Sequence, residues 1–420
     1  MVLVSAGRIF RSRVMGRPGL RPVRAAFIML LAAGGIRSAC AADAVPAQPS
    51  PAPKYVLFLT ADGFRTDYIE RMAPPHLGAL IAEGVRVTAV ANVFPTVTTP
   101  NMASLVTGAF PRTTGIGANT QYVREEDRIV SAPRTSVATI AGMLRKAGWV
   151  TGAVGHFMLQ STVDHYAAPG YADAEKTTDA IIDFLQNKNA RFVGAIYGAT
   201  DEEGHRHGPE SAEVRAAVLG IDRAVGRLVA YLKERGIFEQ TLITFNSDHG
   251  MSAFEKQAAS IEPAQTLAQA GFRVATSVAE LDAQTQIVVL NAGVRLVYFR
   301  AVPEAAERQR AEAVLRQIAG VDVLGRTELA ALGCHDNRSG DLIVSPKPGF
   351  TISNAGGPGG LHGRFAEQNP VLFFRGPGIR SHAIVDSART IDIVPTLLRL
   401  VDVAPASSVE GTVIAGVLKN

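Results

Sequence analysis

The chain has 420 residues, of which 47% are hydrophobic and 19% are charged, a balance that excludes a low-complexity or disordered protein. Its formal charge is +4, but the first 41 residues hold seven Arg and no acidic residue, so 35 basic and 38 acidic residues remain beyond them. This remaining charge gives no reason to expect a nucleic-acid-binding module.

The first 41 residues have the pattern of a secretory signal peptide. A basic start is followed by an apolar run at 25–33 and by small residues at 39–41. The apolar run is too short to cross a bilayer, so we expect no transmembrane span. A lipid anchor on Cys40 is a weaker alternative, because Arg37 stands where a leucine-like residue is needed. We therefore expect an exported protein, either periplasmic or secreted.

After a flexible linker at 42–53, apolar runs alternate with helical patterns across one large domain at 54–420. The expected strands are 55–60, 150–155, 193–198, 242–247 and 371–374. The expected helices lie near 76–83, 100–107, 136–147, 174–188, 210–235 and 390–401. Unbroken apolar strands are typical of sheets covered on both faces. The alternation predicts an α/β sandwich around a mostly parallel central sheet.

Residues 252–350 interrupt this alternation and are expected to form an inserted smaller subdomain beside the active site. This stretch has its own candidate strands at 286–290, 295–299 and 341–345, and a polar helix around 303–318.

Polar residues follow the predicted strands, at the edge where open α/β sheets bind their ligands. Three Asp and three His occur after these strands or in the Gly-rich loop 356–363: Asp62, Asp201, His205, Asp248, His249 and His362. Imidazole and carboxylate groups suit zinc, and six of them are too many for one catalytic ion. The set therefore predicts two metal ions about 4 Å apart, an arrangement that serves phosphoryl transfer.

A candidate nucleophile lies in the segment 94–108. Pro100 suits the first turn of a helix and Thr99 suits its cap, which places Thr98 beside a helix N-terminus that favours an anion. A threonine hydroxyl attacks well when a bound zinc ion lowers its pKa. Asn101 is expected to donate a hydrogen bond to a phosphoryl oxygen.

Taken together, these stretches resemble the nucleotide pyrophosphatase/phosphodiesterase family of the alkaline phosphatase superfamily. The matching motifs, in chain order, are TADG (60–63), FPTVTTPN (94–101), LVTGAFP (105–111), DEEGHRHGP (201–209), SDHGM (247–251) and LHG (361–363). The resemblance extends from about residue 54 to about residue 403 and implies an alkaline-phosphatase-like catalytic domain.

The resemblance also implies roles for these residues. One Zn²⁺ would be held by Asp62, Thr98, Asp248 and His249, and a second by Asp201, His205 and His362. Thr98 would attack phosphorus in line and form a covalent phosphothreonine, which water then hydrolyses. Asn101 and a backbone N–H near Thr99 would stabilise the phosphoryl oxygens. The implied substrate is a small-molecule phosphodiester or nucleotide.

Three alternatives remain open at this point. A phosphonate hydrolase or a phosphomonoesterase would use the same two-metal site, and a metal-binding protein without turnover would keep only the ligands. Relatives that prefer monoesters add Lys or Arg over the phosphoryl group, whereas only His occurs as a basic residue between Trp149 and Lys176. This favours diesters. Thr99 also replaces the aromatic residue that is common after the nucleophile, and the oligomeric state is not determined by the sequence.

Overall fold

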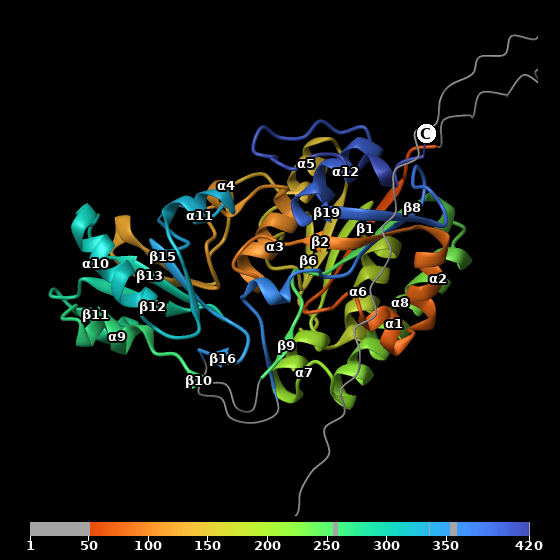
Figure 1. The fold of residues 1–420 in the computed structure, drawn as a ribbon. Helices are drawn as coiled ribbons and strands as arrows, with labels where there is room; N and C mark the ends of the chain where they lie inside the picture. Colours follow the sequence, from red (N-terminus) through yellow and green to blue (C-terminus); the bar gives the residue numbers. More distant parts are fainter. Residues whose placement is uncertain (1–50, 255–258, 336, 353–358, 420) are drawn as a thin grey trace, which may run out of the picture. The chain divides into compact units, whose positions relative to one another are not determined.

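The computed structural model describes residues 51–254, 259–335, 337–352 and 359–419. Among these residues, a sheet of eight strands forms the centre of the fold (Figure 1). In spatial order the strands are β19 (Ala383–Arg389), β2 (Val85–Ala91), β18 (Leu372–Arg375), β8 (Thr241–Asn246), β1 (Tyr55–Ala61), β7 (Phe192–Tyr197), β5 (Thr151–Val154) and β6 (His165–Ala167). Strand β18 is antiparallel to both of its neighbours, and every other neighbouring pair is parallel. The predicted mostly parallel sheet is confirmed.

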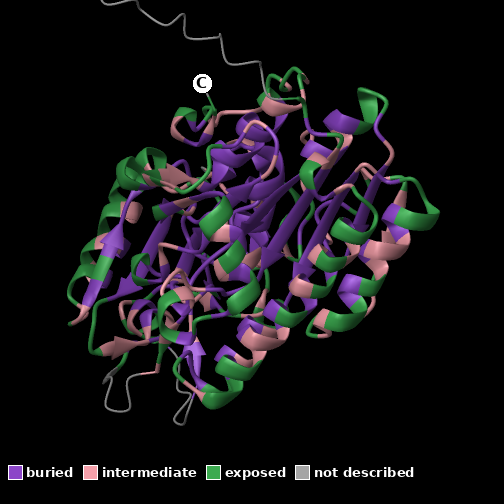
Figure 2. Cartoon of the chain, turned by 90° about the vertical axis from the view of Figure 1, so that its right-hand side faces the viewer, coloured by how far each residue is buried: buried purple, intermediate pink, exposed green. Residues whose placement is uncertain are grey.

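Helices cover both faces of this sheet. One face packs against α3 (Thr98–Thr107), α5 (Ile140–Lys146) and α12 (Ile393–Leu400). The other face packs against α1 (Tyr68–Met72), α2 (Pro75–Glu83), α6 (Ala174–Asn187) and α8 (Ala212–Glu234). Figure 2 shows the buried strands between exposed outer helix surfaces.

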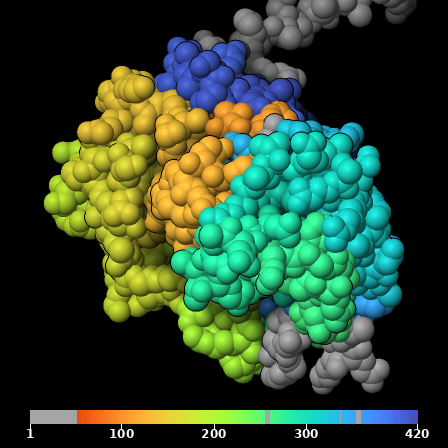
Figure 3. Space-filling model, turned by 90° about the vertical axis from the view of Figure 1, so that its left-hand side faces the viewer, coloured from red at the N-terminus to blue at the C-terminus, as the bar shows by residue number. Residues whose placement is uncertain are grey.

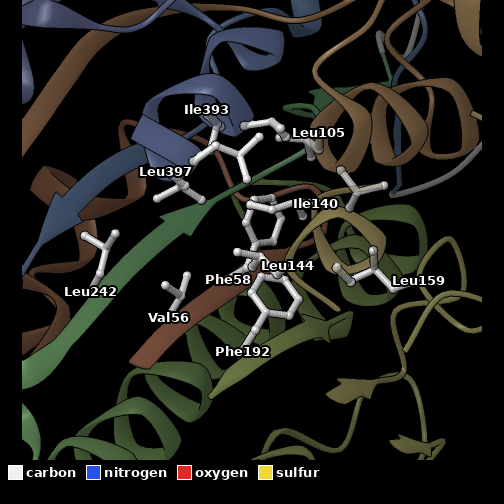
Figure 4. Packing of buried hydrophobic residues seen from close by; sticks show 14 of the residues in the cluster. Val56, Phe58, Leu105, Ile140, Leu144, Leu159, Phe192, Leu242, Ile393 and Leu397 are labelled. Carbon is white, nitrogen blue, oxygen red and sulfur yellow. The ribbon is translucent and has the colours of Figure 1, made fainter. Parts of the chain in front are cut away.

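Strand β1 shows why an unbroken apolar run belongs at the centre. Val56 and Phe58 point to the first face, where they pack with Leu105 and Ile140 (Figure 4), while Leu57 and Leu59 point to the second. Successive side chains of a strand alternate between faces, so a strand buried on both sides must be apolar throughout.

A second sheet lies in residues 274–346. Its strands, in spatial order, are β11 (Val274–Ala275), β12 (Ile287–Asn291), β13 (Arg295–Phe299), β15 (Leu342–Pro346) and β14 (Val321–Leu324). Its helices are α9 (Pro263–Gln269), α10 (Ala305–Arg316) and α11 (Arg326–Ala331). One face packs against the hairpin of β3 (Thr120–Val123) and β4 (Arg128–Ser131), through Tyr122 and Tyr298 among others. Figure 3 shows this segment, in green to cyan, lying against the orange residues that follow α3.

Strands β2 and β19 and the helix that follows β7 were not predicted from the sequence. Strands β2 and β19 lie at one margin of the central sheet, where several of their residues are exposed, so neither reads as a continuous apolar run. Helix α7 (Ala199–His207) follows β7 directly and is strongly polar, so it lacks the apolar periodicity that marks a helix.

The topology brings several loops to one edge of the sheet. The carboxyl ends of β1, β7, β8 and β2 lie at this edge because these strands run parallel, and the antiparallel β18 begins there. The segment 92–97 leaves β2 at the same edge and leads into α3. Within the described residues, no helix combines the length and the hydrophobicity that a bilayer span requires.

Candidate active site with two metal-binding clusters

The six predicted metal ligands come together at this edge, and each is positioned by a strand end or a short loop. Asp62 follows β1 directly, Asp248 and His249 follow β8, and His362 lies in the loop before β18. Asp201 and His205 are one helical turn apart on α7, which places both side chains on one face of that helix.

The first cluster surrounds the Nε2 atom of His249. This atom lies 3.3 Å from Asp62 Oδ1, 3.3 Å from Asp248 Oδ2 and 3.2 Å from Thr98 Oγ1. Asp62, Asp248 and His249 are each 0% exposed, whereas Thr98 is partly exposed. The hydroxyl of a partly exposed threonine therefore adjoins a buried group of two carboxylates and one imidazole.

The second cluster adjoins the first. Asp201 Oδ1 lies 3.4 Å from His205 Nε2 and 3.7 Å from His362 Nε2, and these two Nε2 atoms are 3.1 Å apart. The rings of His249 and His362 stack with centroids 3.6 Å apart, so the two clusters share one site. The ligand atoms of Asp201, His249 and His362 lie within 4.8 Å of one another, as do those of Asp62, Asp248 and His249.

The hydrogen bonds of the three imidazoles leave their Nε2 atoms available to a cation. Each Nδ1 atom faces a backbone carbonyl oxygen: His205 that of Gly360 at 3.0 Å, His249 that of Gly250 at 2.8 Å and His362 that of Thr96 at 2.8 Å. A carbonyl oxygen only accepts, so each Nδ1 must carry the hydrogen, and in the neutral ring each Nε2 carries a lone pair. This arrangement is typical of histidines that ligate metals.

The carboxylates of the site also have oxygen atoms that are available to a cation. Among the described residues, Asp62 Oδ1, Asp201 Oδ1 and Asp248 Oδ2 are buried without a hydrogen-bond partner. Buried carboxylate oxygens without partners are costly unless a cation compensates their charge. Three imidazole lone pairs and three unpartnered carboxylate oxygens thus converge, and this donor set fits zinc.

The electrostatics of the site follow from burial and mutual repulsion. Burial and the nearby carboxylates of Asp248 and Asp201 raise the pKa of Asp62 well above its usual value. Burial and the charge of Asp201 raise the pKa of Asp248 to about 8. Burial lowers the pKa of His362 to about 3, while the adjacent carboxylate of Asp201 raises the pKa of His205 to about 8. A bound cation would compensate both carboxylates whose ionisation is suppressed.

The geometry around α3 distinguishes three neighbouring threonines. The helix begins at Thr98 with Val97 as its N-cap residue, so Thr99 is not the cap that the sequence suggested. Thr96 is 0% exposed and Thr99 is 5% exposed, whereas Thr98 is partly exposed and its hydroxyl contacts His249. Among the three, Thr98 is the residue that is both partly exposed and adjacent to the clusters.

The structure differs from the sequence prediction at Asn101. Its side chain is 0% exposed and holds the backbone of the preceding loop. The amide nitrogen donates to the carbonyl oxygens of Pro95 and Val97 at 3.0 and 2.9 Å, and the side-chain oxygen accepts from the N–H of Val93 at 3.0 Å. With both amide hydrogens used in this way, Asn101 shapes the loop before Thr98 and presents no donor to the cleft.

Asn119, which the sequence analysis did not identify, lies beside the start of α3 and lines a cavity next to the second cluster. Its side-chain oxygen accepts from the N–H of Thr99 at 2.7 Å, and the residue lines a cavity of about 310 Å³ together with His205 and His362. Within the described part of the chain, no side chain or backbone group bonds its amide nitrogen. One Asn after the run 115–118 is a weak sequence signal, and only the folded chain shows that this residue lines the cavity beside His205 and His362.

Tyr171 is a second residue that the sequence analysis did not identify. Its phenol donates to Asp62 Oδ2 at 2.6 Å, and its ring lies over Gly198, where any Cβ would overlap the aromatic carbons. The hydrogen bond occupies one oxygen of Asp62 and leaves the other, Oδ1, facing His249. A lone Tyr in a loop carries no sequence pattern that predicts such a contact.

Comparison with known families gives one match that covers most of the chain. Residues 56–365 match the family model described as type I phosphodiesterase/nucleotide pyrophosphatase. The matched range contains all six clustered side chains and Thr98.

Curated relatives and solved structures agree with this match. The bis(5'-adenosyl)-triphosphatase ENPP4 of Homo sapiens is 32% identical over 222 residues, which is 48% of this chain and 49% of the relative. ENPP4 of Bos taurus is 29% identical over 54% of this chain and 53% of its own length. The chain thus spans about half the length of the curated relatives it matches.

The solved structures share the fold. Human ectonucleotide pyrophosphatase/phosphodiesterase 5 has a TM-score of 0.71 at 21% identity, over 87% of this chain and 100% of that one. The alkaline phosphatase PafA also has a TM-score of 0.71, at 18% identity, over 88% of this chain and 99% of its own. The predicted alkaline-phosphatase-like fold is confirmed.

Proposed function

The chain belongs to the type I phosphodiesterase/nucleotide pyrophosphatase family, in the alkaline phosphatase superfamily, and from this premise we propose that it is a two-zinc hydrolase of phosphate diesters with Thr98 as its nucleophile. One observation carries the proposal: three Nε2 lone pairs and three unpartnered carboxylate oxygens converge beside the Thr98 hydroxyl. A further support is a murine ENPP5 variant with a threonine-to-alanine substitution, which is inactive and binds AMP.

We assign the proposed ligands to two zinc sites in the way that the family resemblance implies. Asp62, Asp248, His249 and Thr98 hold one ion, and Asp201, His205 and His362 hold the other. Zinc bound at these clusters would lower the pKa of a hydroxyl or water and offset charge on the phosphoryl oxygens.

The side chains then account for the reaction. Thr98 Oγ1 forms a bond to phosphorus while the bond between phosphorus and the leaving oxygen breaks, and the released alcohol takes the proton. Water next attacks the phosphothreonine, the bond to Oγ1 breaks, and Thr98 recovers its proton. Tyr171 holds Asp62 in place, and the amide of Asn119 donates to a phosphoryl oxygen.

The cavity of about 310 Å³ beside His205 and His362 is proposed to receive the leaving group. In-line displacement places the leaving oxygen opposite Thr98, on the side of the second cluster. Phe254, Asn291 and Ala292 line this cavity, and they come from residues 252–350, which we propose to be an inserted subdomain that shapes the substrate site.

Export is proposed from the sequence pattern of the first 41 residues. This signal peptide and most of the linker at 42–53 fall outside the described residues.

The first test measures kcat/KM of the zinc-loaded protein for a phosphate diester and for a phosphate monoester. We expect kcat/KM for the p-nitrophenyl ester of thymidine 5′-monophosphate, a diester, to exceed that for p-nitrophenyl phosphate by at least about 100-fold. A preference for the monoester would contradict the diester assignment and place the protein with phosphatases. Turnover of neither substrate by protein that binds two zinc ions would favour a phosphonate substrate.

The two asparagines give a second prediction with an internal control. Asn119→Ala is expected to lower kcat/KM for the diester by about 100-fold, because it removes a donor to charge that develops on the phosphoryl group. Asn101→Ala is expected to lower the melting temperature, because it leaves the buried N–H of Val93 without its partner and removes one hydrogen bond from each of two carbonyl oxygens. Equal activity of Asn119→Ala and wild type would remove Asn119 from the mechanism.

A further inference from the structure

Thr96 joins the nucleophile segment to the loop that carries His362. Its N–H donates to the carbonyl oxygen of Gly363 at 3.3 Å, and its hydroxyl accepts from the N–H of Gly363 at 3.0 Å. The same hydroxyl donates to the carbonyl oxygen of Arg364 at 2.7 Å. The carbonyl oxygen of Thr96 accepts from His362 Nδ1 at 2.8 Å. All these contacts are made by a residue that is 0% exposed.

Each polar atom of Thr96 has a separate task in this contact. The carbonyl oxygen fixes the hydrogen of His362 on Nδ1, which directs the Nε2 lone pair toward Asp201 and His205. The hydroxyl both donates and accepts, so it fixes residues 363–364 along the nucleophile segment. Only Ser shares this capacity with a similar shape, whereas Val keeps the volume and loses both hydrogen bonds.

The opposite side of the His362 loop is pressed against the turn between β12 and β13. A Cβ added at Gly293 would overlap the carbonyl oxygen of His362, and one added at Gly363 would overlap that of Ala292. Gly363 has φ +127°, which favours glycine. The loop therefore has no room to move toward this turn, and the two hydrogen bonds of the Thr96 hydroxyl fix residues 363–364 to the segment that leads to Thr98.

We propose that Thr96 is a positioning residue that sets the placement of His362, and with it the metal ion held by Asp201, His205 and His362, relative to the nucleophile two residues away. This inference rests on the proposed two-zinc function. His249 is held by its own bond to Gly250, so the proposed ligands Asp62, Asp248 and His249 have no direct hydrogen bond with the Thr96 hydroxyl.

The test measures zinc binding by competition with a chromogenic chelator in wild type, Thr96→Val, Thr96→Ser and the control Thr107→Val. Thr107 is also 0% exposed, and its hydroxyl donates to Ala103 and accepts from Ala109, at the far end of α3. We expect Thr96→Val to lower the affinity for one of the two zinc ions by about 10- to 100-fold. The zinc affinities of Thr96→Ser are expected to stay within about threefold of those of the wild type. Thr107→Val is expected to bind both ions as wild type does, even where its melting temperature falls.

Every outcome decides the proposal. Two zinc ions bound to Thr96→Val with wild-type affinities would overturn the positioning role and leave the proposed function intact. Wild-type protein that binds fewer than two zinc ions would overturn both. If Thr96→Val does not fold, Thr96→Ala carries the same test, and failure of both to fold with zinc present would make Thr96 a residue of general stability and overturn the proposal.

Discussion

Replacing Thr98 by Ala is expected to reduce kcat/KM for a phosphodiester by at least about 10³-fold while two zinc ions remain bound. The hydroxyl lies at the first residue of α3, 3.2 Å from His249 Nε2, and it is the reacting atom of the proposed mechanism. The other six ligands keep their own contacts without it, so the loss should appear in turnover and not in metal content.

Two variants control for this result. Thr98→Ser retains a hydroxyl and is expected to keep activity within about tenfold of wild type. Thr99→Val removes a buried hydroxyl next to the nucleophile but retains the N–H that donates to Asn119, so it should stay active. Acid quenching during turnover should trap phosphate on Thr98, detectable by peptide mass. Near-normal turnover by Thr98→Ala would exclude Thr98 as the nucleophile.

Removing the metal ions is expected to abolish activity and to lower the melting temperature by at least about 5 °C, with both effects reversed by zinc. The physical reason is the pair Asp62 and Asp248, which are 0% exposed and repel each other and Asp201 when ionised. A bound cation compensates this charge, so the free energy of unfolding should be lower for the metal-free protein than for the zinc-loaded protein.

This difference should depend on pH with a defined sign. In the folded metal-free protein, burial and the charge of Asp201 raise the pKa of Asp248 to about 8, and the adjacent carboxylate of Asp201 raises the pKa of His205 to about 8. In the unfolded chain the pKa of Asp248 is near its ordinary value of 3.8, and that of His205 is near 6.5. Between about pH 6.5 and 8 the folded state therefore holds more protons, and stability falls as pH rises through this range.

Asp62, whose pKa is also raised, contributes in the same direction. His362, whose pKa is lowered to about 3, is neutral in the folded state throughout this range. Melting curves with and without chelator at pH 6.5 and 8 check the prediction: the stabilisation by zinc should grow with pH, since zinc competes with protons for the same ligands. A gap that is constant or shrinks toward pH 8 would contradict it.

Much of the site follows from local features of the sequence. The runs that form β1, β7 and β8 are apolar throughout because both faces of these strands are buried, so their ends, and the polar residues beyond them, can be located without the fold. Asp62, Asp248 and His249 are predictable for this reason. The kind of metal can also be inferred from the sequence, because metal preference depends on which donor groups are present.

The strands at one margin of the central sheet could be identified only from the structure. Strand β2 has only three buried residues among seven, and β19 has none, so their hydrophobic pattern is weak and their pairing is set by contacts with β18 and with each other. Helix α7 is polar and carries the candidate metal ligands Asp201 and His205, so it lacks the apolar periodicity by which a helix is recognised.

What the sequence determined by itself was the chemistry: a mostly parallel α/β fold, its family, and a donor set with a threonine beside it. Tertiary structure alone decided which polar side chains are free to act. Asn101 looks like the donor by its motif, yet three backbone groups occupy it, whereas Asn119 reaches the cavity. Thr96 bonds residues more than 260 positions away. Hydrogen-bond satisfaction depends on partners that only folding brings within reach, so no local pattern predicts it.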